Sequence, residues 1–410
     1  MKEFLAKAKS STQIISTLDS RTKSRILKEM AEAIFENGSY IIEENSKDMA
    51  LGKKNNLDSA LLDRLLLDKG RVTAMAKSLV EISALREPVG RVLDGWVNDD
   101  NLRIEKVSVP IGVVGVIYES RPNVTSDVAG LCFKSGNVAI LKGGKEAEFS
   151  NRAIAKILQS VLEINKLPIE LISLLPDSTR EGVAKLIKED SFVDLIVPRG
   201  GEGLIRYISK NASVPVVKHD KGLCHTYIHK DADPKKAISI AINAKCQRPG
   251  VCNAMETLII DREIAKKLLP SIYKAFVDAG TKLKGCSATR EFIFVELATE
   301  DDFDTEYLAN QLNIKVVNSI DDAITHITKY GSGHSEAIIT ENYTASEKFL
   351  NMIDAACVYV NASTRFTDGA VFGFGAEVGI STNKLHARGP MGINELTTYK
   401  FKIYGNGQIR

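Results

Sequence analysis

The stretch Ile111-Gly112-Val113-Val114-Gly115-Val116-Ile117-Tyr118 decides the fold, because it begins a regular alternation of strand-like and helix-like segments. Four short apolar, β-prone runs follow it, at 138–142 (VAILK), 171–175 (LISLL), 192–197 (FVDLIV) and 214–217 (VPVV). Helical patterns lie between several of these runs, for example over 147–164 and 180–190. This alternation is typical of a parallel sheet covered by helices on both faces. It predicts an α/β domain with a doubly wound, mostly parallel sheet.

A second series of the same kind begins at Tyr227 and continues through the runs at 292–295 (FIFV), 314–317 (IKVV), 337–340 (AIIT) and 358–361 (VYVN). A chain of 410 residues is long enough for two or three domains. We therefore expect one doubly wound domain over 1–226, a second over 227–361, and a returning segment over 362–410.

Outside these series, residues 1–90 have a helical pattern, with Ile26, Leu27, Met30, Ala31 and Ile34 at helix spacing. Residues 96–107 (WVNDDNLRIEKV) place a polar turn between β-prone flanks and predict a hairpin. Residues 396–404 (LTTYKFKIY) predict a further strand near the C-terminus.

Composition excludes several classes of protein. The net charge is +2, so nothing favours binding to nucleic acid or an anionic membrane. No apolar run approaches the ~18 residues that a membrane helix needs, and the first residues lack the apolar core of a signal peptide. The six cysteines show no CxxC spacing, and His219, His225 and His229 show no HExxH motif. We expect a cytoplasmic protein with reduced thiols and no metal site.

The clearest candidate for chemistry is Cys252, in the stretch 245–257 (KCQRPGVCNAMET). Pro249 and Gly250 interrupt the chain before it, and the β-prone run 257–260 follows, so the thiol would lie in a loop beside a sheet. Read alone, a cysteine in such a chain is more often a small buried apolar residue.

Four motifs extend this reading: 118–125 (YESRPNVT), 248–257 (RPGVCNAMET), 331–336 (GSGHSE) and 372–392 (FGFGAEVGISTNKLHARGPMG). In this order they resemble the aldehyde dehydrogenase superfamily over nearly the whole chain. The closest resemblance is to members that reduce the acyl phosphate L-glutamyl 5-phosphate to L-glutamate 5-semialdehyde in proline synthesis. The resemblance implies an aldehyde dehydrogenase-like fold in which 96–107 and 396–404 form a small β-extension that joins subunits into a homo-oligomer.

The resemblance also implies a dinucleotide site, although no GxGxxG fingerprint is present. Lys142-Gly143-Gly144-Lys145 follows a predicted strand, where it could otherwise be a solvated turn. By resemblance Lys142 holds the adenosine ribose, and Lys145 stands where NAD-preferring relatives carry a glutamate, which favours NADPH/NADP+. Arg199-Gly200-Gly201 resembles a second phosphate-side loop, and Glu306 matches the carboxylate that binds the nicotinamide ribose, unless it is simply solvated.

For catalysis, the resemblance makes Cys252 the nucleophile that forms a thioester and Asn123 a side-chain donor to the oxyanion. Arg248 is one possible activator of the thiol. Hydrolytic members carry a glutamate where this chain has His219, so a thioester here should hydrolyse poorly. His219 could equally be a polar residue with a structural role.

The substrate carries a phosphate and an α-carboxylate, groups that arginine binds well. The resemblance therefore places Arg248, His334, Ser335, Arg365, His386 and Arg388 at the substrate, whereas scattered arginines are otherwise mostly solvated. The lability of the acyl phosphate suggests association with its producer, glutamate 5-kinase. Two alternatives stay open, a hydrolytic aldehyde dehydrogenase and a non-catalytic scaffold on this fold.

Overall fold

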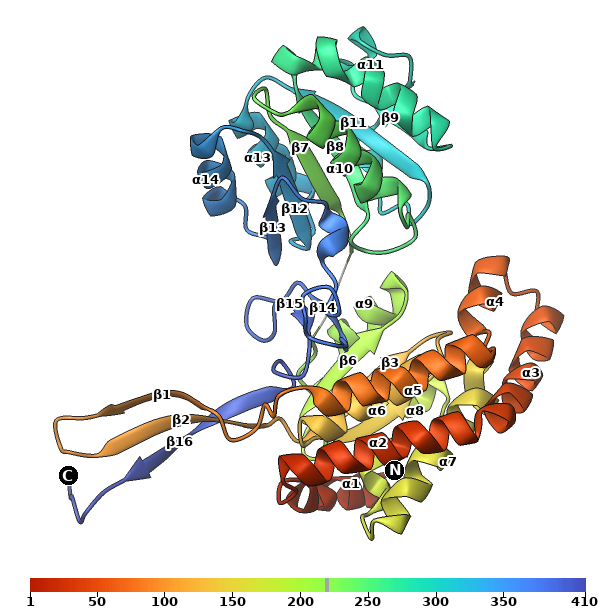
Figure 1. Ribbon diagram of the computed structural model, residues 1–410, viewed down its shortest axis with the longest axis vertical. Coiled ribbons are helices and arrows are strands. Elements are labelled where there is room, and N and C mark those ends of the chain that lie inside the picture. Colours follow the sequence, from red (N-terminus) through yellow and green to blue (C-terminus); the bar gives the residue numbers. More distant parts are fainter. Residues whose placement is uncertain (218–220) are drawn as a thin grey trace. The chain divides into compact units, whose positions relative to one another are not determined.

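A computed structural model describes residues 1–217 and 221–410 of the chain, apart from the side chain of Ala60 (Figure 1). The chain forms two compact units, and each is made of several segments. Unit 1 comprises Met1–Lys218, Gly373–Gly379 and Pro390–Arg410, and unit 2 comprises His219–Phe372 and Ile380–Gly389. The domain limits expected from the sequence, after 226 and 361, stay predictions. The strand Cys224–Ile228 spans the first of these limits.

Unit 1 begins with helices, as its sequence pattern predicts. They are α1 (Lys2–Ile15), α2 (Ser20–Glu36), α3 (Gly38–Lys54), α4 (Ser59–Leu65) and α5 (Lys69–Ala84). Asp19, Asp58 and Asp68 precede α2, α4 and α5, and each side chain accepts a backbone N–H of the first turn. The periodic apolar residues of α2, such as Ile26 and Met30, are buried and form its inner face.

A four-stranded parallel sheet follows in the order β5-β4-β3-β6. Its strands are β3 (Val113–Tyr118), β4 (Val138–Lys142), β5 (Ile172–Leu174) and β6 (Leu195–Arg199). The connecting helices are α6 (Asn123–Lys134), α7 (Glu148–Ile164) and α8 (Arg180–Leu186), and α9 (Glu202–Asn211) follows β6. Because β4 and β6 lie on opposite sides of β3, the order reverses there, and ligands of such sheets bind at the carboxyl ends of strands beside a reversal.

The prediction of a strand at 214–217 is wrong. This segment makes only an isolated bridge between Ile196 and Val216. Pro215 has no N–H with which to continue a ladder, although its carbonyl still accepts the Ile196 N–H.

An antiparallel ribbon completes unit 1 and confirms the predicted hairpin and C-terminal strand. It contains β1 (Val92–Val97), β2 (Arg103–Pro110) and β16 (Thr397–Tyr404) in the order β1-β2-β16. Figure 1 shows it extending beyond the helices of unit 1. The turn is fixed by the Asn98 side chain, which accepts the Leu102 N–H, and by Asn101 in a left-handed conformation at φ 59°.

Unit 2 contains a seven-stranded parallel sheet in the order β10-β9-β11-β8-β7-β12-β13. The strands are β7 (Cys224–Ile228), β8 (Met255–Asp261), β9 (Lys282–Gly285), β10 (Glu296–Leu297), β11 (Gln311–Val317), β12 (Ser335–Ile339) and β13 (Cys357–Val360). The helices are α10 (Pro234–Cys246), α11 (Arg262–Asp278), α12 (Glu300–Phe303), α13 (Ile320–Tyr330) and α14 (Tyr343–Met352). Two short strands, β14 (Gly379–Ser381) and β15 (Gly389–Met391), pair with each other. The two parallel sheets thus confirm the predicted doubly wound α/β class.

The prediction of a strand at 292–295 is also wrong. The N–H groups of Phe292 and Ile293 both donate to the Thr289 carbonyl, which closes a turn, and the strand β10 begins only at Glu296. Periodicity alone cannot tell a short apolar strand from an apolar turn of this kind.

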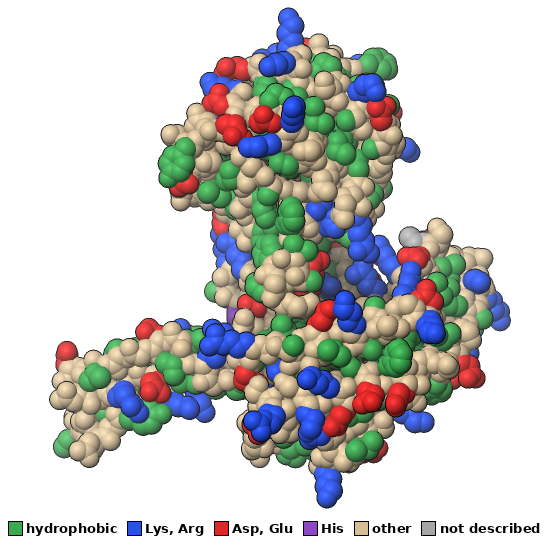
Figure 2. Space-filling view, viewed as in Figure 1, with side chains coloured by type: hydrophobic (Ala, Val, Ile, Leu, Met, Phe, Trp, Pro, Cys, Tyr) green, Lys and Arg blue, Asp and Glu red, His purple; other side chains and the backbone are tan. Residues whose placement is uncertain are grey.

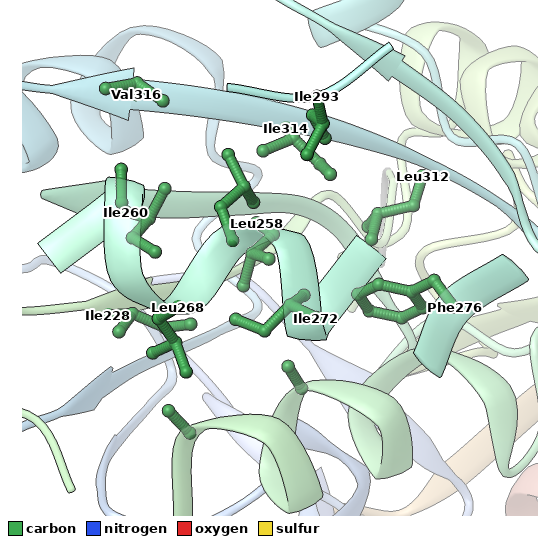
Figure 3. Close-up of a cluster of buried hydrophobic side chains, with 14 of the residues drawn as sticks. Ile228, Leu258, Ile260, Leu268, Ile272, Phe276, Ile293, Leu312, Ile314 and Val316 are labelled. Carbon is green, nitrogen blue, oxygen red and sulfur yellow. The ribbon is translucent and has the colours of Figure 1, made fainter. Parts of the chain in front are cut away.

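The core of unit 2 lies between the sheet and the helices that cover it (Figure 3). Leu258 and Ile260 of β8 and Ile314 of β11 face Leu268 and Ile272 of α11, and all five are buried. Strands whose residues are all buried, such as β3 of unit 1, give the continuous apolar runs seen in the sequence.

Charged side chains of both signs are interspersed on the face of each unit that Figure 2 shows. In the part of the chain that the structure describes, no helix combines the length and the apolar character needed to cross a membrane.

Candidate active site

In unit 1, the segment Lys142 to Lys145 lines a cavity of 530 Å³ at the carboxyl end of β4. Helix α7 supplies part of the opposite wall, including Arg152 and Lys156. A Cβ on Gly143 would collide with Asn151, and a Cβ on Gly144 would collide with Glu146. A larger side chain at either position would have to displace Asn151 or Glu146, and both glycines line the cavity, where a bound phosphate or ribose could approach the backbone closely.

Lys142 and Lys145 differ in environment. Burial lowers the pKa of Lys142, and the carboxylates of Glu146 and Glu119 oppose this change. The side chain of Lys145 is exposed at the rim of the cavity. The fit of an adenosine diphosphate is thus supported by an open cavity, two glycines in its wall and several cationic side chains.

The second predicted phosphate-side loop, Arg199 to Gly201, begins at the carboxyl end of β6. Its contact is with Glu119, whose carboxylate accepts the Gly201 N–H at 2.8 Å, while the Glu119 N–H donates to the Arg199 carbonyl. A dinucleotide phosphate that used the Gly201 N–H would replace this carboxylate. The role of the loop stays a prediction.

Asn123 is the first residue of α6, directly after Pro122. Its Nδ2 donates to Asp127 Oδ2 at 3.0 Å, one turn along the helix. Because an amide NH₂ group has two N–H donors, this bond orients the side chain and leaves one donor for an oxyanion. Burial raises the pKa of Asp127, and its bond from Asn123 opposes the rise.

In unit 2, Cys252 lies in the loop between α10 and β8. Helix α10 begins at Pro234 with the Asp233 side chain accepting the Lys236 N–H, and it ends before Pro249, which cannot extend a helix. The loop therefore meets the sheet at the amino end of β8. The chain thus places its thiol at the edge opposite to the usual ligand edge of a parallel sheet.

The Cys252 loop is fixed by contacts on both sides. Asn253 donates to the Thr367 carbonyl at 2.7 Å, and Thr364 Oγ1 donates to the Asn253 carbonyl at 2.8 Å. The Cys224 thiol donates to the Cys252 carbonyl at 3.2 Å. A Cβ on Gly222 would collide with the Cys252 backbone, so the chain packs tightly there. Cys252 itself is half-buried, and no disulfide involves any of the six cysteines, all of which are described.

Two predicted substrate arginines lie at this loop. The Arg365 guanidinium donates to Gln247 Oε1 at 2.8 Å, and Arg248 is exposed next to Gln247 in sequence. Burial lowers the pKa of Arg365, the charge of Arg248 lowers it further, and the Cys252 thiolate opposes both effects. The structure therefore brings Arg248, Arg365 and Cys252 together, as an anionic substrate would require.

The other predicted substrate residues differ in exposure. His334 and Ser335 are fully buried, with His334 Nδ1 at 2.8 Å from Ser335 Oγ and at 3.6 Å from Cys224 Sγ. His386 and Arg388 are exposed, and Arg388 pairs with Asp354 at 2.6 Å. Contact of these four residues with substrate stays a prediction.

Glu306 is half-buried in the segment between α12 and β11, and its charge raises the pKa of Glu256, four residues after Cys252. The structure therefore places the predicted nicotinamide-ribose carboxylate near the thiol loop. His219 lies outside the described residues, so its predicted role stays a prediction.

Sequence reasoning missed Lys245 and Glu256, which form a buried ion pair at the base of the Cys252 loop. A signal was present, because Glu256 is a charge inside the apolar run of a central strand, and such a charge needs a buried partner. The partner could not be identified, since it lies across a loop whose path the sequence does not determine.

Comparison with known proteins gives consistent results. The family model described as the aldehyde dehydrogenase family matches residues 1–285. The chain is 67% identical to a gamma-glutamyl phosphate reductase of a Nitratiruptor species over 411 residues, covering 100% of both.

Solved structures agree. The chain is similar to the crystal structure of gamma-glutamyl phosphate reductase from Thermotoga maritima, with a TM-score of 0.98, 45% identity and coverage of 100% of this chain and 99% of that chain. It shares the fold, at 18% identity and a TM-score of 0.70, with a glyceraldehyde-3-phosphate dehydrogenase from Methanocaldococcus jannaschii complexed with NADP, covering 99% of this chain and 94% of that chain.

Proposed function

The chain belongs to the aldehyde dehydrogenase family and, within it, to the gamma-glutamyl phosphate reductases, and we propose that it acts through a thioester on Cys252 with NADPH as reductant. Proteins of this kind reduce L-glutamyl 5-phosphate to L-glutamate 5-semialdehyde in proline biosynthesis, and this is the reaction of the chain. The observation that carries the thioester is the fixed loop that holds Cys252 beside Arg248 and Arg365.

The first chemical step uses the thiolate of Cys252. It attacks the acyl carbon, the bond from that carbon to the phosphate oxygen breaks, and inorganic phosphate leaves with the bonding electron pair. Arg248 and Arg365 favour this step in two ways, because their positive charges stabilise the thiolate and bind the anionic groups of the substrate.

The second step reduces the thioester. NADPH, held by the segment Lys142 to Lys145, would supply the hydride for this reduction, and the former carbonyl oxygen would then carry a negative charge. We propose that Asn123 donates the N–H not bonded to Asp127 to this oxyanion. Collapse of the thiohemiacetal breaks the carbon–sulfur bond, releases the aldehyde and regenerates the thiolate.

Family membership establishes an NAD(P) cofactor, and NADPH is our finer proposal. Its support is the cavity beside Lys142 to Lys145, whose cationic side chains suit a 2′-phosphate. A fold relative with 18% identity has been solved with NADP.

The test is the reverse reaction, followed as NADP+ reduction with glutamate 5-semialdehyde, with and without phosphate. We expect turnover that needs phosphate and that Cys252→Ala abolishes. Turnover without phosphate would favour the hydrolytic alternative, for which a thioester must react with water. Dinucleotide binding without any turnover would favour the scaffold instead.

The substrate is a small molecule, and we propose two further partners. One is a second copy of the chain, through the β1-β2-β16 ribbon. The other is glutamate 5-kinase, because direct transfer would protect a labile acyl phosphate. Co-elution of the two purified proteins would support the association, and independent migration at working concentrations would contradict it. We also propose the cytoplasm as the location, since reducing conditions preserve a catalytic thiol.

A further inference from the structure

A buried ion pair closes the base of the Cys252 loop. Lys245 lies in the last turn of α10, Glu256 is the second residue of β8, and Lys245 Nζ is 2.8 Å from Glu256 Oε2. The two side chains are 0% and 2% exposed. A buried pair of this kind has little value for stability compared with apolar residues of similar size, so its presence at this loop calls for another explanation.

Glu256 also contacts the segment that carries Glu306. Its Oε1 accepts the Leu308 N–H at 3.4 Å, and Leu308 has a left-handed conformation with φ at 50°. A Cβ on Gly250 of the thiol loop would lie 3.4 Å from the Leu308 carbonyl oxygen, so the two segments also meet directly. One carboxylate therefore connects the end of α10, the start of β8 and the Glu306 segment.

The charge of this carboxylate is sensitive to its surroundings. Burial raises the pKa of Glu256 to about 7, the ammonium of Lys245 opposes the rise, and the charge of Glu306 adds to it. From β7, Cys224 faces the same region, and the Glu256 charge is among the causes that raise the pKa of its thiol. The raised pKa makes this carboxylate easier to protonate than an exposed glutamate would be.

We propose that Lys245 and Glu256 are positioning residues, which hold the Cys252 loop in one fixed placement against the Glu306 segment. The inference rests on the proposed function, in which Cys252 forms the thioester and Glu306 binds the nicotinamide ribose. Neither residue needs to touch the substrate. Their effect comes through geometry, because a displacement of about 1 Å at a reacting group can cost roughly 100-fold in rate.

Three variants test the proposal. Glu256→Gln removes the carboxylate charge and leaves Lys245 uncompensated. Lys245→Met/Glu256→Leu removes both charges and keeps apolar packing. Glu256→Asp keeps both charges but withdraws the carboxylate by one methylene. The matched control is Lys23→Met/Glu87→Leu, because that pair is also largely buried, at 3% and 23% exposure and 2.6 Å, and belongs to unit 1, whereas the Cys252 loop belongs to unit 2.

Two readouts separate positioning from stability. The first readout is the pH dependence of kcat and KM in the reverse reaction, with kcat calculated per folded molecule. We expect kcat to fall roughly 10- to 100-fold in the first two variants and less in Glu256→Asp, with KM for the semialdehyde little changed. We also expect wild-type kcat to fall as the pH drops through about 7 and Glu256 becomes protonated, a fall that should be absent in Glu256→Gln and present in the control.

The second readout is alkylation of Cys252 by iodoacetamide without cofactor, followed by mass spectrometry. We expect faster alkylation in Glu256→Gln and in the double variant, because the loop is less firmly held in both. In Glu256→Gln the uncompensated ammonium of Lys245 also favours the thiolate, whereas the double variant has no such charge. The proposal would be overturned if all three variants kept the wild-type kcat and the wild-type alkylation rate. It would also be overturned if the control lost as much kcat as they do. If wild type lacks turnover that depends on Cys252, the proposed function fails, while the alkylation rates still decide whether the pair holds the loop.

Discussion

At the scale of single residues, Lys145 is the side chain that we propose selects NADPH. It begins a 3₁₀ turn over Lys145–Ala147, and its side chain is exposed at the rim of the unit 1 cavity. No packing depends on it. Its charge is therefore available to a ligand, and a 2′-phosphate is the group that distinguishes NADPH from NADH.

We predict that Lys145→Glu lowers kcat/KM for NADPH about tenfold and reverses or removes the preference over NADH. The reason is that a charge-assisted hydrogen bond contributes about 1.5–3 kcal/mol, and exposure puts this one at the lower end. The measurement is kcat/KM with each cofactor. Lys69→Glu, on an exposed side chain at the start of α5, is the control and should leave the ratio unchanged. An unaltered ratio in Lys145→Glu would assign the 2′-phosphate to other residues.

The sequence identifies some residues of the candidate site better than others. Cys252 could be predicted because Pro249, Gly250 and the following β-prone run place it in a loop beside a sheet. Two other features could not be predicted, the burial of His334 and the hydrogen bond from the Gly201 N–H to Glu119. Each depends on segments that meet only after folding. Roles that rest on resemblance alone, such as that of His219, remain to be tested by experiment.

At the scale of elements, helix α13 shows how burial fixes the charge of a histidine. His326 is 6% exposed, and its ring lies 5.0 Å from Phe303 and 4.7 Å from Tyr330 between ring centroids. Burial lowers the pKa of His326 from 6.5 to about 3, and the charges of His225 and Lys315 lower it further, opposed by Glu300.

This shift predicts acid sensitivity of unit 2. The folded-state pKa lies below the unfolded value, so the unfolded chain binds the proton more tightly. The stability contributed by neutral His326 is therefore present above about pH 6.5 and is lost as the pH falls toward 3, by about 2 kcal/mol at pH 5.

His326→Phe should remove this dependence while keeping the aromatic packing. The measurement is the urea midpoint of unfolding at pH 8 and at pH 5, where the wild type should lose more stability than the variant. Values at pH 8, where the histidine is neutral in both states, serve as the baseline. Parallel losses in the two proteins would show that other groups cause the acid sensitivity.

The sequence predicts most elements of the fold and fails where local pattern and tertiary contacts disagree. Long periodic segments such as Glu148–Ile164 form the expected helices, and buried runs such as Val113–Tyr118 form strands. The runs at 214–217 and 292–295 have the composition of strands but do not form them. In the first, Pro215 lacks a backbone N–H donor; in the second, the Thr289 carbonyl accepts N–H groups that close a turn. Those competing hydrogen bonds are not visible in periodicity.

At the scale of the whole molecule, the ribbon is the feature most suited to association. Trp96, Tyr399, Phe401 and Ile403 share one face of it and are 44%, 50%, 50% and 60% exposed. Both outer strands, β1 and β16, have an unpaired edge within this sheet. An apolar face and open edges on a three-stranded sheet are a typical subunit interface.

We predict that Phe401→Lys/Ile403→Lys converts an oligomer into smaller species, because it places two charges in the apolar face. Light scattering after size-exclusion chromatography measures the mass. Ile164→Lys, at the end of α7, changes an even more exposed apolar residue, at 78%, outside the ribbon and should keep the wild-type mass. A wild type that is monomeric at working concentrations, or a double variant of unchanged mass, would contradict the prediction.

The pairing of β2 with β16, in which Arg103 lies opposite Tyr404, also constrains biosynthesis. While the ribosome translates the intervening chain at about 5–20 residues per second, β2 is paired only with β1 and its other edge stays bare for tens of seconds. A nascent chain therefore exposes an unsatisfied strand edge throughout the synthesis of unit 2. Because β16 follows the whole of unit 2 in the sequence, the complete ribbon, and any subunit contact through it, can form only after unit 2 has been synthesised.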